Sequence, residues 1–292
     1  MRHFDSVIIN ALEAKRGELE ATFDADIVAY YGPIASVFLP LFRNTLERIP
    51  TADVSRRQRL AIVLNTPGGE VEAVERMVEM TRHWYEEVHF VVPHLAMSAG
   101  TIFCMSGEKI HMDYSSALGP IDPQVQAKDG RWVPALGYLD KFEEMLQKDR
   151  DQQLTGVEFA IAQSQDLAVL RRYEQARDLS VNLLKQWLVQ YKFRNWTHHR
   201  TTPALVGQPV TDQEKEVRAK EIADQLGNNS IWHSHGRMIG INTLRKVLRL
   251  EIEDYTNDNG KRELINMYHD IIVDYMQRQS WTSMLHARNV FN

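Results

Sequence analysis

The sequence predicts an α/β fold with a mainly parallel sheet built from βαβ units, followed by a helical C-terminal region. Two observations lead to this prediction. Short apolar segments alternate with helical patterns between residues 25 and 125, at lengths that suit right-handed crossovers between parallel strands. Beyond residue 135, long patterns with helical spacing dominate the chain.

The first half of the chain contains the signals of such a sheet. Residues 5–21 have the apolar spacing of an amphipathic helix. The segments 59–65 and 88–96 ("RLAIVLN" and "VHFVVPHLA") are nearly continuous apolar runs. Such runs are typical of parallel strands that are covered on both faces. The other expected elements are strands at 25–32 and at the start of 109–122, and helices at 35–49, 70–87 and 98–107.

The second half is predicted to be mostly helical. Its helical patterns cover 135–149, 156–191 and 212–227, and a polar segment at 193–212 is typical of a loop. Residues 235–255 suggest a loop, a helix and a strand, and the tail from Gly260 suggests a helix. We therefore expect a catalytic core with its N-terminal helix at 1–150. A helical extension and the C-terminal part of the core, at 151–292, would complete one integrated domain.

Composition narrows the class of protein. The net charge is −5, with 34 basic and 39 acidic residues, whereas nucleic-acid binders favour a basic face. The single cysteine, Cys104, excludes an internal disulfide and a cysteine-based zinc cluster, and it fits a reducing cytoplasm. Its apolar surroundings favour a buried side chain over a reactive thiol. No uncharged apolar stretch is long enough for a membrane span, so a cytoplasmic protein without metal or organic cofactor is expected.

Two short glycine turns follow two apolar strands, "NTPGG" at 65–69 and "MSAG" at 97–100. In a parallel sheet both turns emerge at the carboxyl ends of the strands, where α/β proteins place their sites. The second turn puts Ser98 at a helix start, where backbone N–H groups are unpaired. The N–H of Ala99, with that of Gly68 or Gly69, would then form an oxyanion hole, in which each donor contributes roughly 3–4 kcal/mol.

Each turn alone has an ordinary structural explanation. "TPGG" alone suggests a helix-entry turn, and "MSAG" alone suggests tight packing with a serine N-cap. The two turns in this order, about 30 residues apart and each after an apolar strand, are far more specific. The pair therefore favours a nucleophilic role for Ser98.

Three segments resemble the serine dehydrogenase proteinase family: "LNTPGGEVEAVERM", "HLAMSAGTIFCMSGEKIHMDYSSALGPIDPQV" and "HGRMIG". These proteins are related to signal peptide peptidase A and to the proteolytic subunit of Clp protease, which share the ClpP/crotonase fold. The resemblance is close over about 25–145 and looser to about 255. It implies a serine peptidase-like hydrolase with Ser98 as its nucleophile, in a fold family that usually forms oligomers.

The resemblance leaves the general base open. Clp subunits carry a histidine in the segment where this chain has Asp122, and no histidine lies between His111 and His198. A Clp-type triad is therefore not supported, and His111, in a strand-like segment, is expected to be structural. His235 lies in the family-like C-terminal segment, where it could order a loop, contact substrate or supply a base.

Relatives of signal peptide peptidase use a lysine base, which must be buried and neutral. Lys141 lies 43 positions after Ser98, beside apolar residues that could desolvate it, and is the preferred candidate. Lys128 and Lys148 are alternatives, and a shift of one position would place Asp140 there instead.

The leading interpretation is a cytoplasmic, homo-oligomeric peptidase that cleaves peptides or proteins with a Ser98–Lys141 dyad. Two other interpretations stay open. One is a crotonase-like thioester enzyme that uses the same oxyanion donors. The other is a catalytically inactive relative that serves as an assembly or peptide-binding module.

Overall fold

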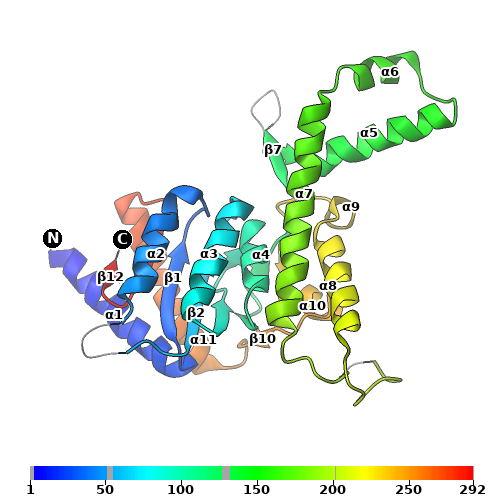
Figure 1. The fold of residues 1–292 in the computed structure, drawn as a ribbon. Helices are drawn as coiled ribbons and strands as arrows, with labels where there is room; N and C mark the ends of the chain where they lie inside the picture. The colour runs from blue at the N-terminus through cyan, green and yellow to red at the C-terminus, as the bar shows by residue number, and fades with distance from the viewer. Residues whose placement is uncertain (1–2, 51–54, 127–131, 201, 292) are drawn as a thin grey trace.

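A mainly parallel sheet runs through the centre of the molecule, with helices on both faces (Figure 1). The computed structural model describes residues 3–50, 55–126, 132–200 and 202–291. Five neighbouring strands of the sheet are parallel, and two antiparallel strands extend it at one edge. In spatial order the strands are β10 (Glu253–Asp254), β5 (Lys109–Met112), β3 (Glu87–Val91), β2 (Arg59–Asn65), β1 (Asp26–Tyr31), β11 (Met284–Ala287) and β12 (Val290–Phe291).

Alternation along the central strands separates two hydrophobic cores. In β1, Val28 and Tyr30 face one core, while Ile27 and Ala29 face the other, because successive strand side chains point to opposite faces. The predicted α/β class with a mainly parallel sheet is therefore confirmed. The first core is covered by α2 (Leu39–Arg48), α3 (Val71–Trp84), α4 (Ala99–Met105), α7 (Leu167–Trp187) and α8 (Asp212–Leu226), and the second by α1 (His3–Phe23) and α11 (Asn259–Gln279).

A second, three-stranded sheet lies beyond the main one. It consists of β4 (Leu95–Ala96), β6 (Ala117–Leu118) and β9 (Ile239–Gly240). β4 and β6 run parallel, and β9 runs antiparallel to β6. Three segments therefore meet at one edge of this sheet. They are the residues after β4, the residues after β6 and the residues before β9.

A helical arm projects away from the sheets (Figure 1). It follows the hairpin of β7 (Gln124–Gln126) and β8 (Trp132–Pro134) and consists of α5 (Ala135–Arg150) and α6 (Gly156–Gln163). The sequence suggested one continuous helical pattern over 156–191, but the chain breaks before α7. The break occurs because Asp166 caps α7 by accepting a hydrogen bond from the Ala168 N–H.

The C-terminal tail differs from the helix expected after Gly260. α11 ends at Gln279, and the chain then forms β11 and β12. β11 is fully buried and pairs antiparallel with β1. Four buried residues are too few to show a strand period, so only their place beside β1 reveals this strand. The remaining short elements are η1 (Ser36–Phe38), η2 (Leu188–Lys192), α9 (Asn229–Trp232) and α10 (Ile241–Lys246).

None of the described helices combines the length and the apolarity that crossing a bilayer requires.

Three buried histidines make the fold sensitive to acid. Burial lowers the pKa of His89 and His286, and it lowers that of His111 well below the usual value. His89 Nδ1 and His111 Nε2 lie 3.3 Å apart between the main-sheet strands β3 and β5. This place in the core agrees with the structural role expected for His111.

We predict that the free energy of unfolding falls as the pH drops from 7.5 to 5.5. Below about pH 6.5 the unfolded histidines take up protons while the buried ones stay neutral, which costs up to about 1.4 kcal/mol per histidine per pH unit. Urea unfolding at the two pH values measures the loss. His111→Leu should reduce this difference, whereas the same change at the exposed His198 should leave it unaltered. An equal loss in both variants would contradict the assignment.

Candidate active site

Ser98 occupies a strained turn directly before α4. Its backbone has φ 53° and ψ −119°, close to the first central position of a type II′ turn, which glycine normally fills. A non-glycine residue in such a conformation costs roughly 1–3 kcal/mol, and residues of this kind cluster at functional sites. The side chain is partly buried, and its hydroxyl has no hydrogen-bond partner among the described residues.

The glycine turn after β2 is held by the loop that follows β1. The Ile34 N–H donates to the Gly68 carbonyl at 2.8 Å, and the Glu70 N–H donates to the Ile34 carbonyl at 2.9 Å. Gly68 and Gly69 have φ values of 107° and 148°. A Cβ on Gly69 would lie 1.9 Å from the Ile34 carbonyl oxygen, so this position requires glycine.

Backbone hydrogen bonds join the glycine turn to the serine turn. The Thr66 N–H donates to the Leu95 carbonyl, and the Met97 N–H donates to the Thr66 carbonyl, both at 3.0 Å. A Cβ on Gly68 would approach the Ser98 Cβ to 2.8 Å. The predicted meeting of the two turns therefore occurs at contact distance.

Two backbone N–H groups are available at this junction. The Gly68 N–H donates to Thr66 Oγ1 at 3.0 Å, so it is already engaged. The Gly69 N–H has no acceptor among the described residues. Ala99 begins α4, so its N–H has no acceptor within the helix. Of the two glycines considered from sequence, the geometry thus favours Gly69 as the partner of Ala99.

Thr101 ties the segment after β6 to the serine turn. Its hydroxyl lies 2.8 Å from the Ala96 carbonyl and 2.9 Å from both the N and the O of Gly119. A Cβ on Gly119 would lie 2.6 Å from Met97 Cε. The "LGPID" segment is therefore packed directly against the residue that precedes Ser98.

Asp122 and His235 form a pair at the same edge of the small sheet. The Asp122 carboxylate is 1% exposed, and its Oδ1 lies 3.0 Å from His235 Nδ1. Gln124 Nε2 donates to the other carboxylate oxygen at 3.1 Å. The pairing continues the antiparallel register of β6 with β9, in which Leu118 lies opposite Ile239. His235 Nε2 is left without a hydrogen-bond partner among the described residues.

Asp122 and His235 were considered separately from the sequence, and their contact was not predicted. The register of β6 with β9 could have revealed this contact. In an antiparallel pair, two residues lie opposite each other when the sum of their numbers is the same as for the other pairs.

Two of the three lysines considered as a base, Lys141 and Lys148, lie on α5 of the helical arm. The Lys141 side chain is 73% exposed, and its Nζ lies 2.6 Å from Glu144 Oε2. Lys148 Nζ lies 2.6 Å from Glu158 Oε1. Lys128 lies outside the described residues. No hydrogen bond connects Ser98 with Lys141 in the part of the chain that the structure describes.

Cys104 lies on α4, the helix that begins after Ser98. Cys104 is fully buried in the first core, and burial raises the pKa of its thiol, in agreement with the packing role expected for it. Among the described residues, no group of three or more His, Cys, Asp or Glu side chains is arranged to hold a metal ion.

We predict that Ser98→Gly is more stable than Ser98→Ala by about 1 kcal/mol, because glycine adopts the positive φ without strain. Both variants lack the hydroxyl, so the comparison isolates the backbone. Urea unfolding midpoints measure the difference. Ser106, which ends α4 with an ordinary φ of −82°, supplies the matched control, where the glycine variant should be the less stable one. If the alanine variant is the more stable one at both positions, the strain at Ser98 is contradicted.

Comparisons with known proteins add to this geometry. Uncharacterized protein MJ0137 of Methanocaldococcus jannaschii is 39% identical over 64 residues, 22% of each chain. Uncharacterized protein MJ1495 of the same organism is 25% identical over 208 residues, 71% of this chain and 56% of the relative. The chain thus spans about a fifth and about half of the lengths of these two relatives.

Two solved structures of mutants of 1510-N membrane-bound stomatin-specific protease, one in complex with a substrate peptide, are similar to this chain. They match at TM-scores of 0.44 and 0.43, with 15% and 13% identity. The matches cover 77% of this chain and 72% and 76% of those chains.

A family model covers more of the sequence than the first relative does. The model described as ClpP-like SDH-type serine proteinase matches residues 53–206, just over half of the chain. The matched stretch contains both turns and the helical arm. The chain belongs to the ClpP-like SDH-type serine proteinase family.

Proposed function

We propose that the chain is a serine peptidase that cleaves peptide bonds through Ser98. The Ser98 Oγ attacks the scissile carbonyl, and the N–H groups of Gly69 and Ala99 bind the oxygen that becomes negatively charged. The observation that carries this proposal is the unpartnered Ser98 hydroxyl, held on a strained turn against a glycine turn with a free N–H. Membership of a proteinase family supports a peptide or protein as substrate.

The reaction needs a group that accepts the Ser98 proton and later returns it to the leaving amine. In the Ser–Lys form of the proposal this group is Lys141. An exposed lysine stays protonated at neutral pH, and Lys141 is paired with Glu144. The Ser–Lys form therefore requires the Lys141 amine to leave Glu144 and reach the Ser98 hydroxyl before catalysis.

A second candidate for the base is His235. Its Nδ1 is held by the buried Asp122 carboxylate, which leaves Nε2 to exchange a proton. A carboxylate that orients an imidazole in this way is the arrangement found in serine triads. Ser98 follows β4 and His235 precedes β9, so both lie at one edge of the small sheet, whereas Lys141 lies on the helical arm.

We predict that Ser98→Ala abolishes both peptide hydrolysis and covalent labelling by a fluorophosphonate probe. In the Ser–Lys form, Lys141→Ala slows labelling about 100-fold or more, as loss of a general base does, while Lys148→Ala leaves it unchanged. In the His–Asp form, His235→Ala has the large effect and Lys141→Ala has none. Labelling rates, followed by intact-protein mass spectrometry, separate the two forms. Wild-type protein that stays unlabelled would contradict the peptidase and favour an inactive peptide-binding relative.

We also propose that the chain forms homo-oligomers through its helical arm. α6 has no buried residue, and Val157 and Phe159 are 73% and 57% exposed. Exposed apolar side chains that gather on one element mark interaction surfaces. The exposure of this segment supports an interface.

Replacing Val157 and Phe159 together by aspartate should lower the mass of the particle in solution, because the charges oppose burial of the arm. Light scattering coupled to gel filtration measures this mass. Val217→Asp, at an isolated position of α8 that is 50% exposed, serves as the control and should leave the mass unchanged. A wild-type protein that is monomeric at micromolar concentration would contradict the proposal.

A further inference from the structure

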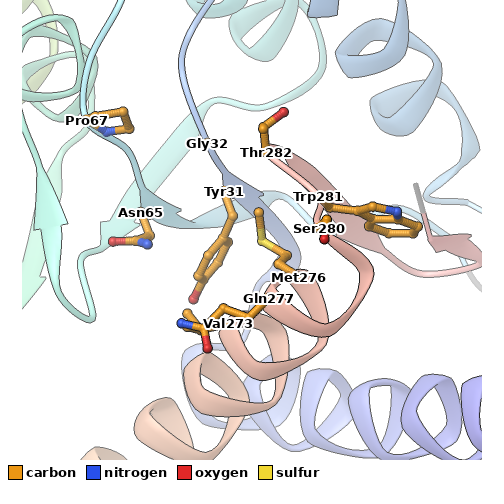
Figure 2. Close-up of a pocket in the computed structure, with 10 residues that line it drawn as sticks. All are labelled: Tyr31, Gly32, Asn65, Pro67, Val273, Met276, Gln277, Ser280, Trp281 and Thr282. Atoms are coloured by element: carbon orange, nitrogen blue, oxygen red, sulfur yellow. The ribbon is translucent and has the colours of Figure 1, made fainter.

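A cavity of about 300 Å³ lies at the carboxyl ends of β1 and β2, beside the glycine turn (Figure 2). Its walls come from the end of β1, the end of β2 with the start of the turn, the last turns of α11, and the connection to β11. The lining residues are Tyr31, Gly32, Asn65, Pro67, Val273, Met276, Gln277, Ser280, Trp281 and Thr282.

Backbone contacts fix the walls of this cavity. Gly32 has φ 115°, and a Cβ there would lie 2.6 Å from the Thr282 carbonyl oxygen. The Gly32 N–H donates to the Asn65 carbonyl at 3.0 Å, and the Trp281 N–H donates to the Met276 carbonyl at 2.9 Å. The cavity is therefore built into the fold before any ligand arrives, as small-molecule sites usually are.

The cavity adjoins the position where a scissile bond would lie. Pro67 lines the cavity, and the next residue, Gly68, approaches Ser98 to contact distance. Consecutive Cα atoms are about 3.8 Å apart, and an extended peptide advances about 3.3–3.6 Å per residue. A peptide whose carbonyl reaches Ser98 can therefore place one of its nearest side chains in the cavity.

The lining indicates which side chain fits. Pro67, Val273, Met276 and Trp281 supply apolar surface. The polar lining side chains are uncharged, and no lining residue is Asp, Glu, Lys or Arg; they are Asn65, Gln277, Ser280 and Thr282. The Tyr31 hydroxyl already bonds to His269 Nδ1 at 2.9 Å, so it is not an open partner. A charged side chain would lose its water without gaining a counter-charge, whereas methionine adapts to apolar side chains of different shape.

We propose that this cavity is a specificity subsite that accepts an uncharged, apolar side chain of a peptide substrate close to the scissile bond. The proposal rests on the proposed peptidase function of Ser98. It assigns selectivity to α11 and its connection to β11, which lie outside the segment that matches the family model.

Two substitutions test the subsite. Met276→Trp fills the cavity, and Gln277→Lys, at an exposed lining position, brings a positive charge to its rim without disturbing the core. Met267 lies on the same helix, is 43% exposed and does not line the cavity, so Met267→Trp and Met267→Lys are the matched controls. The substrates are peptides that carry leucine, phenylalanine, glutamate or alanine at successive positions around one cleavage site.

Filling the cavity should lower kcat/KM at least tenfold for peptides with leucine or phenylalanine at one position, while alanine peptides are cut as before. Gln277→Lys should raise the relative kcat/KM of the glutamate peptide at that position. The small fluorophosphonate probe should label all four variants at the wild-type rate. Selectivity that is the same in Met276→Trp and Met267→Trp would overturn the subsite.

A binding measurement tests the subsite independently of peptide hydrolysis by Ser98. The Ser98→Ala variant should bind the apolar peptide, and adding Met276→Trp should weaken the Kd at least tenfold by calorimetry. If Ser98 is never labelled but this weakening is seen, the peptidase proposal fails and the apolar site stands. If Ser98 is labelled but neither cavity variant alters selectivity or Kd, the subsite alone is overturned.

Discussion

The close approach of two backbone turns is the constraint on which the site depends. Thr66 accepts from Met97 and donates to Leu95, and these bonds bring the end of β2 within contact of the turn that starts α4. A Cβ on Gly100 would lie 2.4 Å from Thr66 Cγ2. A side chain at Gly100 or Gly68 would push the two turns apart and separate the Gly69 and Ala99 N–H groups.

The rest of the molecule holds this junction in place. The main sheet delivers the glycine turn at the end of β2, and β4 of the small sheet delivers the serine turn beside it. Helices on both faces bury the strands of the main sheet. The small sheet then brings two more segments to the serine turn, one with Asp122 and one with His235. Such support explains how Ser98 can keep a backbone conformation that is unfavourable by itself. The fold thus maintains a strained backbone at Ser98, whose hydroxyl has no hydrogen-bond partner among the described residues.

Much of this could be predicted from the sequence. The apolar runs before "TPGG" and "MSAG" indicated β2 and β3, and their common direction indicated that the turns would meet, because parallel strands end at one edge. The run at 88–96 was expected to be one strand, but β3 ends at Val91 and Leu95–Ala96 form β4 of the small sheet. β11 could not be predicted, since four residues give no period and only the pairing with β1 defines the strand. The choice between Gly68 and Gly69 was equally hidden, because it depends on which N–H the Thr66 hydroxyl occupies.

Lys141 shows why a candidate base is harder to predict than a nucleophile. Its apolar sequence neighbours suggested a desolvated amine, yet the helix places Glu144 one turn away and directs the amine to solvent. The pairing of Asp122 with His235 depends on the register between segments more than a hundred residues apart. Local sequence therefore pointed to Ser98 and to the proposed oxyanion donors, whereas a proposed proton acceptor depends on tertiary structure.

Whether Ser98 is the nucleophile is tested most directly by a crystal structure of the protein after reaction with a peptide aldehyde. Such an aldehyde forms a tetrahedral adduct on a nucleophilic serine. We expect a covalent bond to Ser98 Oγ, with the adduct oxygen about 2.7–3.1 Å from the backbone nitrogens of Gly69 and Ala99. An unmodified Ser98, or an adduct oxygen that points away from both nitrogens, would contradict it.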